Sequence, residues 1–230
     1  MTPDLVPLAE PLFAEGLRLG LLPPLDRALV LDTEFMTVPG VGRRIFGLGL
    51  GWVRESRPDP FALFTWSPPS LVEVGCRRLK TAAQEQVPIL TWNGASADLA
   101  AAECLIPGIL WERWRIALRP RHLDLYHLVR RHRRALGLEA GRLRLKTVAE
   151  ALGIPRRVRG VSAWQVARYW DAARHSTWPD STWQGRALRR YLLEDVRLLY
   201  AVAVEVAARL ARRAGDRPNV AEDGNVMRAR

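Results

Sequence analysis

Residues 28 to 35 read Ala-Leu-Val-Leu-Asp-Thr-Glu-Phe, an apolar run that leads directly into Asp32 and Glu34. An uninterrupted run of this kind predicts a buried strand. Side chains two residues apart on a strand point to the same face, so the two carboxyl groups leave the strand together. Two buried carboxylates repel each other and lose hydration, which a divalent cation held by carboxylate oxygens can offset. The same stretch also fits a strand end whose acidic side chains face solvent.

The composition favours a protein that binds a polyanion. The chain has 230 residues, 48% of them hydrophobic, which is enough for one large domain with a core. Its formal net charge is +11, and of its 35 basic residues only Lys80 and Lys146 are lysines. Arginine binds phosphate oxygens in pairs, so the bias is typical of nucleic-acid binding, although an arginine-favouring genome would produce it too.

We expect a cytoplasmic protein without a membrane segment. The start of the chain lacks the basic residues of a signal peptide. The most apolar long run, residues 198–211, is interrupted by charged side chains, so it does not resemble a membrane span. Cys76 and Cys104 lie in expected helices and are typical of reduced core cysteines in a cytosolic protein.

Strands and helices follow one another along most of the chain. We expect strands at residues 28–34, 44–53, 61–66, 87–92 and 122–125, and helices at residues 71–86, 97–105, 126–136, 144–152, 163–173 and 185–213. Short loops, including a turn at residues 56–60, join the first three strands into an antiparallel meander. A helix then connects to the fourth strand, so that strand should run parallel to the first.

This order predicts an α/β fold with a central mixed five-stranded sheet flanked by helices. The expected domain covers residues 27–213. Residues 1–26 are expected to form an N-terminal arm packed on the body, and residues 214–230 a polar, disordered tail.

Two further acidic positions accompany the first strand. Asp98 follows the turn Asn93-Gly94 after the fourth strand, which should place it beside Asp32 if strands one and four are neighbours. A helix-capping role would equally explain Asp98. Tyr191 and Asp195 are four residues apart on the last helix and share a face, although a core position would also explain the tyrosine. Glu194 lies about 100° around that helix and is expected to face solvent.

In order, Asp32-Thr33-Glu34, Asn93-Gly94-x-x-x-Asp98 and Tyr191-x-x-x-Asp195 resemble the three motifs of the DEDD superfamily of 3′–5′ exonucleases, in the subgroup with tyrosine in the third motif. The segments His122-Leu-Asp-Leu, Leu145-Lys146-Thr147-Val148-Ala149 and Leu152-Gly-Ile are similar to bacterial ribonuclease-H-like exonuclease domains. The resemblance covers about residues 27–205 and implies a ribonuclease-H-like fold. One departure is Ala97, where the family usually has an aromatic residue.

The resemblance implies a 3′–5′ exonuclease that uses two Mg²⁺ or Mn²⁺ ions on single-stranded DNA or RNA ends and releases nucleoside 5′-monophosphates. By this resemblance, Asp32 bridges both ions, Glu34 and Asp195 complete one site, and Asp98 supports the other. Tyr191 orients the attacking water or accepts its proton.

Several residues are candidates for contact with the nucleic acid. Phe35 and Met36 follow the first motif, where the family places the terminal base, and we expect Thr33 to contact the substrate beside them. Asn93 either orders its turn or binds a phosphate. The arginine-rich segments predict phosphate contacts through Arg130, Arg134, Arg156 and Arg157, although a solvated helix face has the same pattern.

Two aromatic groups of residues add to these candidates. Tryptophans flank the third motif and are candidates for the floor of a groove: Trp164, Trp170, Trp178 and Trp183. The histidines spaced by five residues do not share a helix face, and we expect them to be solvated or to face phosphate: His122, His127 and His132.

Three alternatives remain. His175 and Asp180 have the spacing of the histidine-type third motif, but Pro179 would break the helix that this motif needs. The same scaffold also suits a structure-specific endonuclease. A catalytically weak nucleic-acid-binding module is the third possibility. Protein partners and oligomeric state are left open by the sequence.

Overall fold

The computed structural model describes residues 27–40, 42–54, 57–66, 71–94, 97–98, 122–138, 141–158 and 160–215, and the structural statements below concern these residues. The arm expected at residues 1–26 lies outside them. So do the helix expected at 97–105 beyond Asp98 and the tail beyond residue 215.

Five strands form one mixed sheet in the order β3-β2-β1-β4-β5. Antiparallel pairing joins β1 (Ala28–Val38), β2 (Gly42–Arg54) and β3 (Arg57–Phe64), which is the predicted meander. Parallel pairing adds β4 (Ile89–Thr91) to β1 and β5 (His122–Asp124) to β4. The mixed five-stranded sheet is therefore confirmed, and the strand with the two acidic residues lies at its centre.

The turn predicted at residues 56–60 was wrong for most of its length. Residues 57–60 belong to β3, where Pro58 pairs with Val53 and Pro60 with Gly51. Proline is tolerated there because β3 is an edge strand of the described sheet, so a missing N–H breaks no ladder on its outer side.

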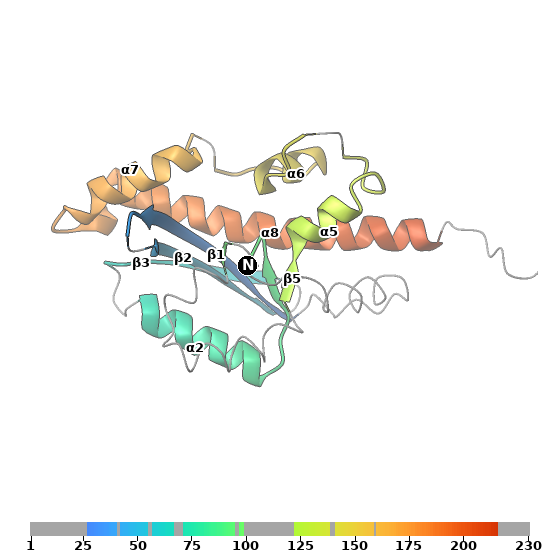
Figure 1. Ribbon diagram of the computed structural model, residues 1–230, viewed down its shortest axis with the longest axis horizontal. Helices are drawn as coiled ribbons and strands as arrows, with labels where there is room; N and C mark the ends of the chain where they lie inside the picture. Colours follow the sequence, from blue (N-terminus) through green and yellow to red (C-terminus); the bar gives the residue numbers. More distant parts are fainter. Residues whose placement is uncertain are drawn as a thin grey trace, which may run out of the picture.

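Helices cover both faces of the sheet (Figure 1). One face carries α2 (Leu71–Gln84), and the other carries the long α8 (Trp183–Gly215) together with α5 (Leu125–Arg131), α6 (Leu145–Ala151), α7 (Ala163–Arg174) and the short η3 (Pro179–Ser181). Alternate residues of β1 serve the two cores: Leu29 and Leu31 pack on the α2 side, and Ala28 and Val30 on the α8 side. By this alternation Asp32 and Glu34 face α8.

The helix expected at residues 126–136 ends early, at Arg131. His132 caps it, and the following residues form turns up to Gly137, whose φ is +71°. A left-handed residue of this kind ends a helix, and glycine adopts it without steric cost.

The contact between β2 and α8 depends on glycine. A Cβ atom at Gly51 would lie 2.6 Å from a methyl group of Val196 on α8. We expect Gly51→Ala to lower the free energy of unfolding by about 1–3 kcal/mol through overpacking. Denaturant titration measures the loss, and Val196→Ala in the same chain should recover part of it. Strictly additive losses would show that this contact is not the cause.

Candidate active site

Three carboxyl groups from β1 and α8 meet between the sheet and the helix. Asp32 and Glu34 come from β1 and Asp195 from α8, and one oxygen of each lies within 4.8 Å of the other two. Asp32 and Glu34 are half-buried, and Asp195 is buried. Residues separated by more than 150 positions in the chain therefore converge at one point in the fold.

Burial and mutual repulsion raise the pKa of these carboxyl groups. Desolvation and the charges of Asp98, Asp195 and Glu34 raise the pKa of Asp32 well above its usual value. Desolvation, with the charge of Asp195, raises the pKa of Glu34 to about 8. Burial also raises the pKa of Asp195, although the ammonium group of Lys146 opposes this. The cluster therefore holds protons near neutral pH that a bound cation would displace.

These shifts predict that the metal-free protein loses stability as the pH rises. A carboxyl group with a raised pKa stabilises the folded state below its unfolded pKa, and this contribution is lost as the pH rises through the folded value. For Glu34, with a folded pKa of about 8, we expect a loss on the order of 1–2 kcal/mol between pH 6.5 and 8. Denaturant titrations in EDTA measure it. Glu34→Gln should make the dependence shallower, with Asp98, whose pKa is about 7, still contributing, and a flat profile in the unmutated protein would contradict the expectation.

The site contains buried oxygens to which no residue in the described part of the chain donates a hydrogen bond. Asp32 Oδ2, Asp98 Oδ2 and Asp195 Oδ1 accept no hydrogen bond from any described residue. Buried acceptors almost always have a partner, so three of them in one region need an explanation. Oxygen-only ligand sets suit hard cations such as Mg²⁺ or Mn²⁺. The chemistry of Asp32, Glu34 and Asp195 therefore fits a divalent cation.

Asp98 lies beside this group of three but is not part of it. Its Oδ1 accepts hydrogen bonds from Thr33 N (3.0 Å) and Thr33 Oγ1 (2.8 Å). Because β4 ends at Thr91, the Thr33 N–H is free to bond to Asp98. Desolvation raises the pKa of Asp98 to about 7, although the Thr33 hydrogen bonds lower it. Thr33 itself is buried, and its hydroxyl group is directed at Asp98.

The turn after β4 positions Asp98. Asn93 has φ +59°, a left-handed conformation that asparagine tolerates better than most residues. Its N–H donates to Asp124 Oδ1 (2.9 Å), and its carbonyl accepts from Ala97 N (3.0 Å). Asn93 thus orders the turn, which is one of the two roles expected for it.

Lys146 belongs to the site, and the sequence analysis did not identify it. Helix α6 places its Nζ 2.9 Å from Asp195 Oδ2 and 3.4 Å from the centroid of the Tyr191 ring. Tyr191 is buried, and its phenol lies close enough to Asp195 to lower the pKa of that carboxyl group. Burial and the nearby carboxylates raise the pKa of Tyr191, so its phenol stays protonated. The sequence offers one indication that Lys146 has a role in the site: it is one of only two lysines and lies in a segment that carries the family resemblance.

Glu194 is buried, so the expectation that it faces solvent was wrong. Its carboxylate pairs with Arg197 at 2.8 Å and accepts a hydrogen bond from Arg157 N at 2.7 Å. Burial opposes ionisation, but the hydrogen bonds from Arg197 and Arg157 bring the pKa of Glu194 below its usual value. Arg197 also donates to Pro155 O, so the segment that follows α6 covers this face of α8.

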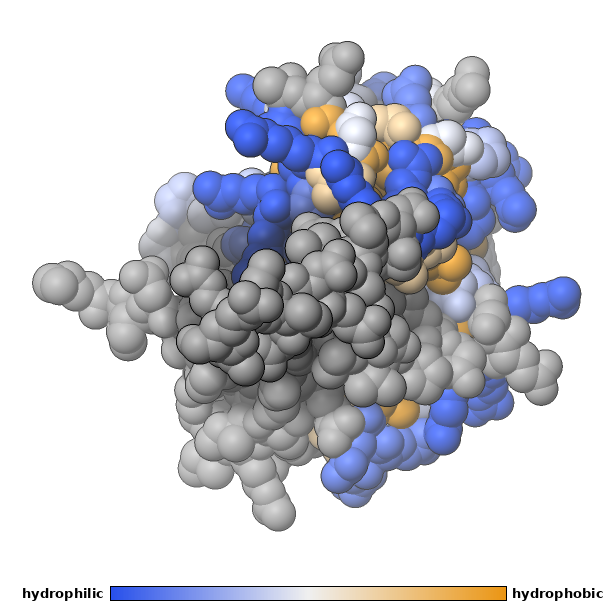
Figure 2. Space-filling view, turned by 90° about the vertical axis from the view of Figure 1, so that its right-hand side faces the viewer, coloured by the Kyte–Doolittle hydropathy of each residue, from blue (hydrophilic) through white to orange (hydrophobic). Residues whose placement is uncertain are grey.

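Most of the arginines expected to bind nucleic acid are exposed, whereas the two hydrophobic candidates pack against the core. Arg130, Arg134 and Arg157 are exposed, and Figure 2 shows hydrophilic side chains over the end of the molecule that α5, α6 and α8 form. Arg156 is half-buried and donates to Val158 O. Two hydrophobic candidates point to opposite faces: Phe35 packs on the α2 side, and Met36 packs with the cluster that contains Tyr191.

The expectation for the histidines was wrong for His122. A ring nitrogen of His122 lies 2.7 Å from Thr91 Oγ1, and burial lowers the pKa of His122 to about 4, so the ring is neutral. The alternative third motif does not enter the site. His175 lies 3.7 Å from Asp171, and Asp180 pairs with Arg189 at 2.7 Å, on the exposed surface near η3.

The fold and this cluster agree with the comparison with known families. A model of the RNase H superfamily matches residues 29–207, and the chain belongs to that superfamily. Membership confirms the ribonuclease-H-like fold and points to a nuclease that acts on nucleic acid, in a class that generally uses divalent metals. Neither the curated proteins nor the solved structures contain a significant match. Among the described helices, none has the length and apolar character that crossing a bilayer requires.

Proposed function

We propose that the chain is a metal-dependent 3′–5′ exonuclease of the DEDD type with a tyrosine in its third motif. It would act on single-stranded DNA or RNA ends and release nucleoside 5′-monophosphates. One observation carries the proposal: Asp32, Glu34 and Asp195 approach within 4.8 Å. It is supported by one oxygen each of Asp32 and Asp195 that accepts no hydrogen bond within the described residues.

In this proposal Asp32, Glu34 and Asp195 would hold Mg²⁺ or Mn²⁺, and Asp98, whose Oδ2 accepts no hydrogen bond from a described residue, would support a second ion. When bound, such ions would lower the pKa of an attacking water and stabilise the leaving 3′ oxygen. Thr33 then acts as a positioning residue, because its two hydrogen bonds fix the orientation of Asp98.

Tyr191 keeps both of the roles that the resemblance allows. In the metal-free protein burial and the nearby carboxylates raise the pKa of Tyr191, so the protonated phenol can donate a hydrogen bond that orients the attacking water. Bound cations would offset the carboxylate charges that raise this pKa, so Tyr191 would also be able to accept the proton of that water. Lys146 lies 2.9 Å from Asp195 and against the Tyr191 ring, so its ammonium group offsets the negative charge of Asp195.

Oligonucleotides labelled at the 3′ or the 5′ end test the function in Mg²⁺, Mn²⁺ or EDTA. Stepwise shortening from the 3′ end that stops in EDTA is the expected result. A single internal cut would favour the structure-specific endonuclease, and binding without cleavage would favour the catalytically weak module. Matched DNA and RNA strands decide which sugar the site accepts.

A further inference from the structure

Large aromatic side chains are exposed on the hairpin that α7 and α8 form. Trp164, Trp178 and Trp183 are 64%, 74% and 56% exposed. Trp170, the fourth tryptophan of the expected groove floor, is buried against Phe46 and is excluded from any such role. Exposed tryptophans that share one pocket mark a binding surface more often than isolated apolar residues do.

Two of these three tryptophans line a pocket. Trp164 and Trp183 belong to its wall, and Trp178 does not. Its volume of about 320 Å³ is at the small end of the range for ligand sites. A pocket of this size and lining suits one planar ring system.

The wall combines ring faces with polar groups. Tyr169 and Trp183 meet edge to face at 4.9 Å, and the Arg168 guanidinium lies 5.4 Å from the Trp164 ring. Arg168 forms no ion pair with another described residue, so its charge is available to a phosphate. Gln184 adds an amide that can donate to and accept from the edge of a base. Aromatic faces beside an arginine are the usual elements of a single-strand binding site.

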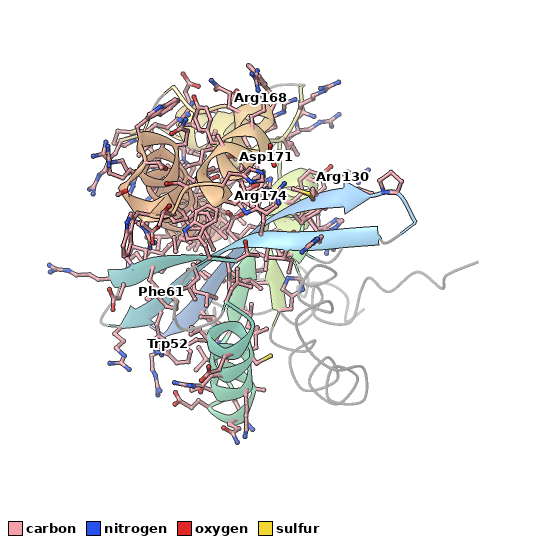
Figure 3. All side chains as sticks on the ribbon, turned by 90° about the vertical axis from the view of Figure 1, so that its left-hand side faces the viewer. Trp52, Phe61, Arg130, Arg168, Asp171 and Arg174 are labelled. Carbon is pink, nitrogen blue, oxygen red and sulfur yellow. The ribbon has the colours of Figure 1, made fainter. Side chains whose placement is uncertain are left out.

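The pocket lies next to the candidate active site along α8. Gln184 precedes Tyr191 by seven residues and Asp195 by eleven, so all three share one helix face, with Gln184 about 10 Å from Tyr191 along the axis. Tyr169, in the pocket wall, also packs against the cluster that contains Tyr191. In Figure 3, Arg168 and Arg174 lie on this side of the sheet, opposite Trp52 and Phe61.

We propose that this pocket is a second nucleobase-binding site, which holds an unpaired base of the substrate strand away from the scissile end. This second site rests on the proposed function, because it assumes that the same strand also enters the carboxylate site. The base stacks against Trp164 and Trp183, and Arg168 binds the adjoining phosphate. The site would let the enzyme prefer strands with an unpaired stretch behind the 3′ end over short fragments.

The test measures the affinity for a fluorescent single-stranded oligonucleotide in EDTA, where a metal-dependent nuclease does not cleave. Trp164→Ala and Trp183→Ala should each weaken binding by roughly 5- to 100-fold. Trp178→Ala is the matched control, because Trp178 is the most exposed of the three but lies outside the pocket. The affinity of the Trp178→Ala variant for the oligonucleotide should match that of the unmutated protein.

A series of oligonucleotides, each with one abasic nucleotide at a different position, identifies which base occupies the pocket. The unmutated protein should lose affinity when the abasic position reaches one internal site, and this position effect should disappear in Trp164→Ala and Trp183→Ala. Unchanged affinity in both variants, or a position effect that persists in them, would overturn the proposal. If a second copy of the chain bound to this surface instead, the variants would change oligomeric state without changing affinity for the oligonucleotide. That outcome would also overturn the proposal.

Failure of this inference and failure of the proposed function remain distinguishable. Cleavage from the 3′ end with normal affinity in both tryptophan variants would refute the pocket alone. Position-dependent binding without cleavage in any metal would refute the exonuclease alone. Both side chains are more than half exposed, so thermal unfolding should show that the variants fold.

Discussion

Asp32→Ala is expected to abolish hydrolysis while leaving substrate binding largely intact. The carboxyl groups of Glu34 and Asp195 each have an oxygen within 4.8 Å of one from Asp32, and the charges of Asp98, Asp195 and Glu34 all raise the pKa of Asp32. Cations in such sites supply several kcal/mol of transition-state stabilisation, so the rate of cleavage should fall about 1,000-fold or more. Single-turnover cleavage measures the rate, and anisotropy in EDTA measures binding.

The control for this substitution also tests the alternative third motif. Asp180→Ala removes an exposed aspartate whose partners are Arg189 and Trp66, outside the cluster. Cleavage by this variant should stay within a few-fold of normal, whereas Asp195→Ala should behave like Asp32→Ala. An Asp32→Ala variant with near-normal turnover would refute the assignment. If Asp180→Ala abolished cleavage and Asp195→Ala did not, the third motif would be His175 and Asp180 of the histidine-type alternative.

Local sequence pattern was sufficient to predict the framework that positions the site. The apolar run before Asp32 predicted a buried strand, and β1 lies at the centre of a sheet covered on both faces. Because a helix precedes the fourth strand, that strand was expected to run parallel to the first, and β4 pairs with β1 in this way. Strand periodicity then directed Asp32 and Glu34 to one face, and helix periodicity directed Tyr191 and Asp195 to another. Strand and helix periodicities depend only on residues close together in the chain, so a single sequence is enough to recognise them.

The features that were missed depend on which segments meet in space. Helix geometry correctly turned Glu194 away from Asp195, but it could not show that residues 155–158 cover that face. The expected substrate contact of Thr33 stays a prediction, but the sequence did not show that the end of β4 leaves the Thr33 N–H to bond with Asp98. Lys146 near the start of a helix resembles a solvated residue until α6 is packed on α8.

The second large effect is expected from Lys146→Met. The Lys146 ammonium pairs with Asp195 at 2.9 Å, and the two side chains are 23% and 8% exposed. Removing one partner leaves a buried carboxylate without compensation, so the free energy of unfolding of the metal-free protein should fall by on the order of 3 kcal/mol. Denaturant titration in EDTA measures the change. Lys80→Met is the matched control, since Lys80 is the only other lysine and is exposed on α2; it should change stability by less than about 0.5 kcal/mol.

Divalent cations should reduce the cost of Lys146→Met. In the proposed enzyme the cations and the Lys146 ammonium both compensate the charge of Asp195, so saturating Mg²⁺ should restore much of the lost stability. By the same reasoning, the variant should bind Mn²⁺ at least as tightly as the unmutated protein, because one positive charge no longer competes for the carboxylates. Calorimetric titration with Mn²⁺ measures this affinity without any reference to cleavage. A loss of stability that Mg²⁺ does not reduce, together with weaker Mn²⁺ binding, would mean that Lys146 holds the ligands in place and does not substitute for a cation's charge.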